Sequence, residues 1–284
     1  PEGINLSSRQ LGSPLDLDAA LKVVGSMGKV RYGILGASED DVVFDADDLS
    51  ITQEGSDYGV ARFLYETKSE AGVYQGVGFI STLSEHPEED AYVQGLDYHF
   101  LSSQGKWKAD GHVFYSDTDE EGAGLGGFAD LTYRPSRRIQ VNVSASHYDD
   151  QLDLNDLGFL RRNDVTNFWM QAEYRRYDFD WARKIYLNSF LSYEVNGDGE
   201  KTNKEIGGRT GIDFNNRHEL RWDVAYKPER IDDRDSRGNG SYIKKQHHRT
   251  SFEYRTDSSR RIYNRIKMNY SKESQGGERY VFRN

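Results

Sequence analysis

The chain has 284 residues, with 37 Lys and Arg against 47 Asp and Glu, which gives a net charge of −10. It contains no Cys, so disulfide frameworks, thiol nucleophiles and cysteine-based zinc sites are excluded. No stretch approaches the roughly 18 apolar residues that a transmembrane helix needs. The acidic balance argues against a nucleic-acid partner, because phosphate binding needs clustered basic side chains. The mean hydropathy of −0.84 is typical of disordered chains, yet 13% of the residues are aromatic, which indicates an ordered protein.

Period-two alternation of apolar and polar residues is the dominant pattern, and no stretch of comparable length shows the period of a helix. The clearest case is 139–146, where Ile139, Val141, Val143 and Ala145 alternate with polar residues. The pattern predicts about 14 strands of roughly 8–11 residues. In chain order they cover 15–24, 29–37, 58–67, 73–82, 91–101, 106–116, 126–134, 139–146, 168–175, 185–195, 209–215, 219–226, 248–256 and 261–271.

The segments between these strands are expected to alternate in length. Short turns fall near 26–28, 68–72, 102–105, 135–137, 215–217 and 257–259. Longer, mostly acidic loops cover 39–57, 83–90, 117–125, 148–166, 196–208 and 229–247. Short turns at one end and long loops at the other are typical of an up-and-down antiparallel meander. No linker interrupts it, so we expect residues 1–284 to form a single domain.

A meander of this size is expected to close, because open edges template aggregation and long twisted sheets curl. Side chains cannot fill the lumen of so wide a barrel. The polar face would therefore line the interior and the apolar face would meet lipid. We predict an all-β fold, an antiparallel up-and-down transmembrane β-barrel that is complete or part of a larger barrel. The alternative is a soluble β-sandwich, propeller or β-solenoid.

Tyrosines near the ends of the predicted strands favour the membrane interpretation, because aromatic girdles lie at both membrane interfaces. The residues assigned to these girdles are Tyr32, Tyr58, Tyr74, Tyr115, Tyr133, Tyr148, Tyr177, Tyr193, Tyr226 and Tyr270.

Three segments carry a resemblance to a known family: LDLDAALKVVGSMGKVRYGILGAS (15–38), YGVARFLYE (58–66) and LGFLRRNDVTNFWMQAEYRR (157–176). They resemble a bacterial outer-membrane β-barrel domain family of unknown function, usually found C-terminal to a family-9-like carbohydrate-binding domain. The resemblance implies an outer-membrane location, the barrel fold and a link to glycans through the preceding domain. It implies no catalytic residues. No closing strand is recognisable in the C-terminal RYVFRN, and we expect the chain to be part of a longer protein.

Charged residues on the polar side of the predicted strands are the candidate functional residues. Both signs occur, which would give transverse fields across a wet pore or a salt-bridged, plug-like interior, while solvated residues without selectivity are the alternative. The candidate pore-lining residues are Lys22, Arg31, Lys108, Asp110, Asp130, Glu173, Arg175, Arg221, Asp223, Arg265 and Lys267.

Acidic loops could bind Ca²⁺ or bridge cations to lipopolysaccharide, although solvated loops are the simpler interpretation. We therefore expect no metal and no cofactor. The acidic residues are Asp40, Asp41, Asp45, Asp47, Asp48, Asp117, Asp119, Glu120, Glu121, Asp232, Asp233 and Asp235. GAGLGG at 122–127 fits a dinucleotide fingerprint, but it leads into a predicted strand instead of a helix and is rejected.

Two Asp-x-His pairs, Asp97 with His99 and Asp110 with His112, each place both side chains on one face of a strand. If these strands pair through the turn at 102–105, an Asp/His cluster forms, and such clusters can serve hydrolysis. No nucleophile motif accompanies them, so we do not expect an enzyme.

The leading hypothesis is an outer-membrane β-barrel that acts as a passive pore or transport component with a mixed-charge lumen. The alternative is a plugged barrel that anchors a carbohydrate- or partner-binding domain, and a lumenal hydrolase is the third. The expected partners are outer-membrane lipid and lipopolysaccharide, with a carbohydrate or a protein as further candidates.

Overall fold

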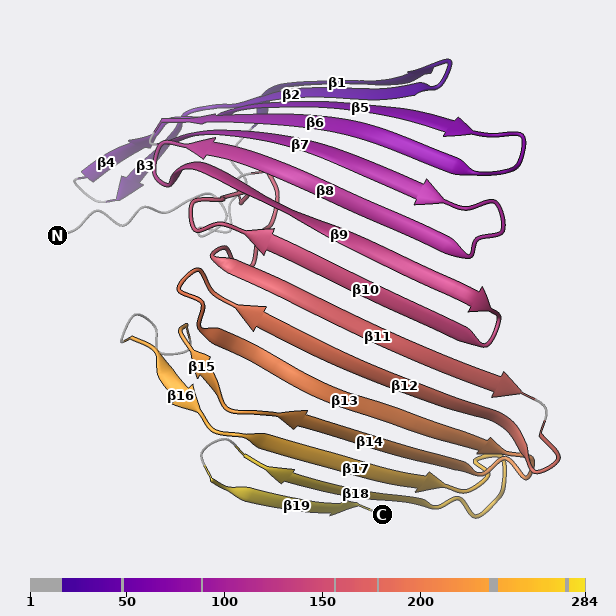
Figure 1. Cartoon of the computed structure of the whole chain (residues 1–284). Helices are drawn as coiled ribbons and strands as arrows, with labels where there is room; N and C mark the ends of the chain where they lie inside the picture. The colour runs from indigo at the N-terminus through magenta and orange to yellow at the C-terminus, as the bar shows by residue number, and fades with distance from the viewer. Residues whose placement is uncertain are drawn as a thin grey trace.

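The computed structural model describes residues 17–46, 49–87, 89–155, 157–177, 179–234, 240–273 and 276–283. Fifteen strands in this part of the chain form one antiparallel sheet in which neighbours along the sheet are hydrogen-bonded (Figure 1). The strands are, in sheet order, β1 (Leu17–Met27), β2 (Val30–Glu39), β5 (Asp57–Lys68), β6 (Tyr74–His86), β7 (Glu89–Leu101), β8 (Trp107–Thr118), β9 (Gly122–Ser136), β10 (Ile139–Tyr148), β11 (Val165–Tyr177), β12 (Ala182–Val195), β13 (Lys201–Phe214), β14 (Glu219–Lys227), β17 (His247–Arg255), β18 (Arg265–Lys272) and β19 (Glu278–Arg283). Within the described ranges, no helix is long and apolar enough to cross a membrane.

The structure confirms an all-β fold of up-and-down antiparallel strands, and each of the predicted strands is present. Residues 15–16 of the first predicted strand lie outside the described part. The predicted strand 261–271 begins later, at Arg265, because a hydrogen bond from Thr256 N to Asn264 O (2.9 Å) closes the preceding loop. β19 was not predicted, yet it pairs with β18 from Lys272 opposite Glu278 to Lys267 opposite Arg283.

Three of the six predicted long loops are instead short turns, because the strands on either side continue into them. β6 and β7 pair as far as His86 and Glu89, and β8 and β9 pair as far as Thr118 and Gly122. Similarly, β12 and β13 leave only residues 196–200 between them. The composition of these three segments indicated loops, but backbone hydrogen bonds between neighbouring strands keep their outer residues in the sheet.

The other three long connections lie at the same end of the sheet. Two contain hairpins of their own, β3 (Val42–Ala46) with β4 (Leu49–Gln53) and β15 (Arg230–Asp232) with β16 (Tyr242–Lys244). The third is the segment 149–164, named here the inner loop. Turns at the opposite end are mostly short, as predicted (Figure 1).

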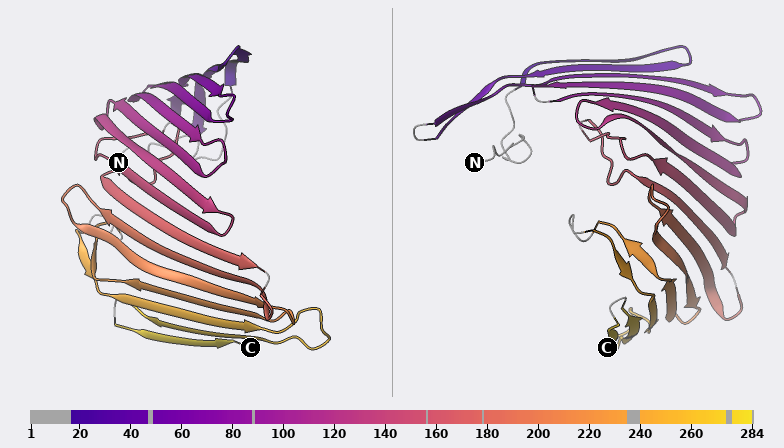
Figure 2. Two further views of the ribbon diagram at one scale, coloured as in Figure 1. Left: turned by 45° about the vertical axis from the view of Figure 1, so that its right-hand side comes forward. Right: turned by 60° about the vertical axis from the view of Figure 1, so that its left-hand side comes forward.

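The sheet curls as a curved wall, with the inner loop and the β15–β16 hairpin on the inside of the curve (Figure 2). β1 and β19 form its two edges, and among the described strands these two do not pair with each other. The wall is compatible with a barrel and is not closed.

The register gives the sheet two faces of opposite chemistry, because directly paired residues point to the same side. One face carries rows such as Phe79–Leu96–Val113 and Trp222–Phe252–Met268 across neighbouring strands. Leu96 is 59% exposed and Val113 is 55% exposed, so this apolar face is uncovered. The other face is polar, and the inner loop packs on it.

The aromatic-girdle prediction is wrong for four of its ten tyrosines. Tyr58, Tyr74, Tyr148 and Tyr177 lie on the polar face by register. The Tyr74 hydroxyl, for example, donates to Glu66 Oε1 at 2.6 Å. A tyrosine near the end of a strand can lie on either face of the sheet, because the face depends only on whether its position along the strand is odd or even. The other six lie on the apolar face: Tyr32, Tyr115, Tyr133, Tyr193, Tyr226 and Tyr270.

The inner loop is anchored on the polar face by a fully buried side chain, Leu152. Two β9 glycines make room for it, because a Cβ on Gly124 would lie 2.3 Å from the Leu152 backbone and one on Gly126 would lie 2.6 Å from Leu152 Cδ2. Next to it, Asp153 N donates to Ser116 Oγ at 3.0 Å. The loop is therefore part of the packed structure.

Gly124→Ala should lift the inner loop, because the added methyl group overlaps the Leu152 backbone. Overpacking of this kind costs about 1–3 kcal/mol. Trypsin should then cleave the folded chain faster after Arg161 and Arg162. Gly33→Ala is the matched control, since a Cβ there meets only Val24 Cγ1 at 3.6 Å. Equal cleavage rates for the two variants would contradict the packing described here.

Candidate functional site

All eleven candidate pore-lining residues lie on the polar face. The register joins them across neighbouring strands, with Asp110 opposite Asp130 and Arg221 in one row with Glu253 and Lys267. Lys22 and Arg31 reach the same face through β1, β2 and β5. That this face lines a pore remains a prediction.

Nine of the eleven form ion pairs, and the pairs mix the two signs locally. Arg175 Nε lies 2.6 Å from Glu173 Oε1, and Lys108 Nζ lies 2.6 Å from Asp110 Oδ2. The other pairs are Arg31 with Glu66, Asp223 with Arg209, Arg221 with Asp213 and Glu219, and both Arg265 and Lys267 with Glu253. Lys22 and Asp130 have no ion-pair partner within the described ranges.

Glu253 is the most crowded of these charges. Its carboxylate is 9% exposed and is surrounded by Arg255, Arg265 and Lys267, with Arg265 Nε 3.0 Å away. Glu253 was not among the predicted pore-lining residues, and neither were Glu66, Arg209 and Asp213, which form ion pairs with such residues. The same alternation places each of them on the polar face, so counting every second residue along these strands would have found them.

The structure brings the two Asp-x-His pairs together on β7 and β8, near their short-turn end. His99 Nδ1 lies 2.8 Å from Asp110 Oδ1, and His99 Nε2 lies 2.9 Å from Asp97 Oδ2. His112 stacks on Phe128 with ring centroids 4.8 Å apart. Asp97, His99, Asp110 and His112 are named here the Asp–His cluster.

Arg62 on β5 was not predicted as a site residue either, and it binds the Asp97 carboxylate of the cluster. Its guanidinium binds both oxygens of Asp97, with Nη2 to Oδ2 at 2.9 Å, and the Asp97 side chain is only 2% exposed. Gly78 between them makes room, because a Cβ there would lie 2.4 Å from Asp97 Oδ2. The cluster therefore has a buried carboxylate held in a fixed orientation.

A serine-type catalytic triad is not formed by this cluster. Both ring nitrogens of His99 face carboxylates, so neither is left to take a proton from a hydroxyl. No hydrogen bond joins the His112 ring to the rest of the described chain. The geometry supports charge pairing or coordination at this position.

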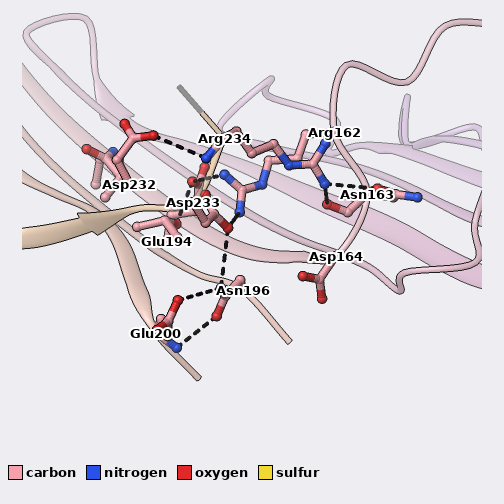
Figure 3. A network of polar contacts seen from close by, with 12 residues as sticks. Arg162, Asn163, Asp164, Glu194, Asn196, Glu200, Asp232, Asp233 and Arg234 are labelled. Carbon is pink, nitrogen blue, oxygen red and sulfur yellow. Dashed lines mark hydrogen bonds and ion pairs between the residues drawn. The ribbon is translucent and has the colours of Figure 1, made fainter. Parts of the chain in front are cut away.

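A second polar network joins the inner loop to β12 and to the segment that follows β15 (Figure 3). Arg162 Nη2 donates to Asp233 Oδ2 at 2.6 Å, and Arg162 Nη1 lies 3.6 Å from Glu194 Oε1 on β12. Asn196 Nδ2 also donates to Asp233 Oδ2, at 3.3 Å. No pattern in the sequence indicates this network, because Arg162 lies in a stretch without periodicity. The network holds the inner loop against the inside of the wall.

Several acidic loop residues contribute to this end of the molecule as hydrogen-bond or ion-pair partners. Asp41 Oδ1 accepts from Gly55 N at 2.9 Å, Asp119 Oδ2 accepts from Asp90 N at 3.2 Å, and Asp232 forms an ion pair with Lys244. Asp47, Asp48 and Asp235 lie outside the described residues. GAGLGG lies within β9, as the rejection of the dinucleotide fingerprint required.

Comparison with known proteins gives a family match and a weak similarity to a solved structure. Residues 77–283 match the family described as "Domain of unknown function (DUF5916)", and since this is most of the chain, the chain belongs to that family. No curated protein matches. A solved structure of a mutant of Rh. blastica porin aligns over 93% of this chain and 98% of its own, with 11% identity and a TM-score of 0.31.

Arg62→Met should destabilise the folded chain strongly, because it leaves the Asp97 carboxylate buried without its guanidinium partner. Breaking a buried pair in this way costs about 3–5 kcal/mol. Urea unfolding of the folded protein in detergent measures it. Arg175→Met is the matched control, since that pair with Glu173 is more exposed and is worth about 0–1 kcal/mol. Equal midpoints for the two variants would argue against a buried pair.

Proposed function

We propose that this member of the DUF5916 family is a wall of an outer-membrane β-barrel in a Gram-negative bacterium and acts as a passive pore or transport component. The observation that carries the proposal is the two-faced sheet: fifteen strands with one uncovered apolar face and one ion-paired polar face. Lipid, and lipopolysaccharide at the rim, would contact the apolar face.

The exposed apolar face favours the proposal that this side of the sheet is in contact with lipid. Side chains such as Leu96, Ile206, Trp222 and Met268 are all more than half exposed, and they lie on strands from β7 to β18. A continuous apolar surface of this extent in water would drive aggregation, whereas in a bilayer it replaces lipid-lipid contacts. Between the two edge strands, each strand of the sheet also pairs its backbone groups with both neighbours, which hydrocarbon requires.

The polar face supports a wet interior with little preference for either sign of ion. Its charges neutralise each other at short range in pairs such as Lys108–Asp110 and Glu173–Arg175. A lumen lined by rings of one sign would select strongly, whereas paired charges leave a weak net field. We therefore propose that the solutes are small and hydrophilic, with weak discrimination by charge.

Closure of the barrel follows a parity rule. Alternating strand directions around a closed sheet require an even number of strands, as in bacterial single-chain barrels. The described part contributes fifteen, so direct pairing of β1 with β19 would be parallel. Either this one parallel seam or a further strand would close the wall.

A plugged barrel that anchors a carbohydrate- or partner-binding domain is the second candidate. The inward position of the inner loop favours it, because Leu152 and the Arg162 network fix this loop over the polar face. No catalytic step is assigned to the Asp–His cluster, since His99 has no ring nitrogen free to take a proton from a hydroxyl.

Two adjacent residues of β10 test the orientation of the wall. Val143→Arg should cost about 2–4 kcal/mol of folding stability in lipid vesicles, because it places a charge on the lipid side near mid-strand. Ser144→Arg should cost much less, because Ser144 lies on the polar face directly opposite Asp130. Unfolding in urea from vesicles measures both. A larger loss for Ser144→Arg would reverse the assignment of the faces.

The pore proposal is tested by single-channel recording of the full chain in planar bilayers. We expect a stable open current with similar permeabilities for K⁺ and Cl⁻, because the interior charges are paired. Arg162→Ala should increase the conductance, since it removes the cation that holds Glu194 and Asp233 to the inner loop.

Arg134→Ala is the matched control for this recording. Arg134 lies at the opposite end of β9, where its Nε donates to Gln140 Oε1 at 2.8 Å, far from the inner loop along the strand. We expect its conductance to equal that of the wild type. Absence of current in protein that folds and is heat-modifiable would exclude the pore and favour the anchor.

A further inference from the structure

The Asp–His cluster has a geometry that the pore function does not use. One ligand atom each from Asp97, His99 and His112 lies within 4.8 Å of the others. Three side chains with this spacing can be joined to one ion after small adjustments of their rotamers, since Zn²⁺ binds nitrogen and oxygen at roughly 2.0–2.2 Å. The residues come from β7 and β8, whose ladder places Asp97 directly opposite His112.

The contacts of His99 are the strongest indication that the cluster binds a ligand. Its Nδ1 faces Asp110 and its Nε2 faces Asp97, each within 3 Å. A neutral imidazole has only one N–H, so one nitrogen lone pair must face a carboxylate oxygen. Two acceptors in that position repel each other unless a proton or a metal cation lies between them.

Asp110 faces one of the two ring nitrogens of His99. It lies on β8 directly opposite His99, with its Oδ1 2.8 Å from Nδ1. In the tautomer that carries its proton on Nδ1, Asp110 accepts that N–H and the Nε2 lone pair is directed towards Asp97. A carboxylate that holds the second N–H of a ligating histidine is the usual outer partner at zinc sites, because it fixes the ring orientation and raises ligand basicity.

His112 supplies the third donor. Its ring stacks on Phe128 and approaches His99 edge-on with centroids 6.0 Å apart, and no hydrogen bond to the rest of the described chain uses its nitrogens. Asp97 is held by Arg62 in a fixed orientation, and Oδ2 retains a second lone pair. Two imidazoles and one carboxylate form a donor set typical of Zn²⁺ sites with an open position.

We propose that Asp97, His99 and His112 bind a divalent transition-metal ion, Zn²⁺ in the first instance, with Asp110 as the positioning residue for His99. The site lies on the polar face, so water can complete the coordination. Arg62 and Lys108 balance the charges of Asp97 and Asp110, which limits the attraction of the site for a cation.

The proposal is tested by titrating the folded, metal-free full chain in detergent with Zn²⁺, followed by calorimetry, and with Co²⁺, followed by visible absorption. We expect saturable binding of one ion per chain and a Co²⁺ spectrum of low coordination number. His112→Gln should weaken Zn²⁺ binding at least about tenfold, because it removes a ligand. Asp110→Asn should weaken it about 10–100-fold through the orientation of His99.

His147→Gln is the matched control, because His147 lies on the apolar face and pairs with Thr166 Oγ1 at 2.8 Å, away from the cluster. Its Zn²⁺ affinity should equal that of the wild type. His112→Gln is expected to fold, since no hydrogen bond within the described part of the chain uses the ring, and heat-modifiability with far-ultraviolet circular dichroism verifies this. If His112→Gln does not fold, the Zn²⁺ affinity of Asp110→Asn is compared with that of His147→Gln instead.

Two outcomes would overturn the proposal: no saturable Zn²⁺ binding to the folded wild type, or equal affinities in the cluster variants and His147→Gln. In either case the contacts of His99 with Asp97 and Asp110 are hydrogen bonds within the polar face and not part of a metal site. The result is independent of conductance, because metal binding is measured without any current, and its failure leaves the pore proposal unchanged.

Discussion

The nearly unbroken antiparallel register is the constraint on which the rest of the structure depends. Successive side chains of a strand point to opposite faces, so a slip of one residue would exchange every polar and apolar side chain of that strand. Register shifts are confined to the β1–β2, β9–β10 and β12–β13 pairs, and each lies near a strand end. The middle of the wall therefore keeps one apolar and one polar face from edge to edge.

The register also determines which charges meet. Some ion pairs on the polar face join residues that alternate along one strand, such as Glu173 and Arg175, and others join residues that face each other on neighbouring strands, such as Arg209 and Asp223. A nearby cation compensates for the cost of burying a carboxylate, as Arg62 does for Asp97. In the Asp–His cluster, the same register places His99 between the carboxylates of Asp97 and Asp110.

The long connections determine how open the inside of the wall is. In the inner loop, Leu152 packs against β9 glycines and Arg162 reaches both β12 and the segment after β15. These contacts make the loop an internal element of the wall, in a position to narrow the lumen of a pore or to contribute to a plug. Conductance distinguishes the two, because the same geometry serves both.

Alternation in the sequence predicts fourteen of the fifteen strands of the sheet, their up-and-down order and the face on which Lys108, Asp110 and Arg221 lie, because it is a local property of each strand. It did not determine the turn lengths near 86–89 and 118–122, where ladder hydrogen bonds extend strands through polar residues. Only the tertiary structure brought Arg62 to Asp97, 35 positions away, and Arg162 to Asp233, 71 positions away. Contacts across strands depend on the register and on the curl of the whole sheet, which no single segment of sequence contains.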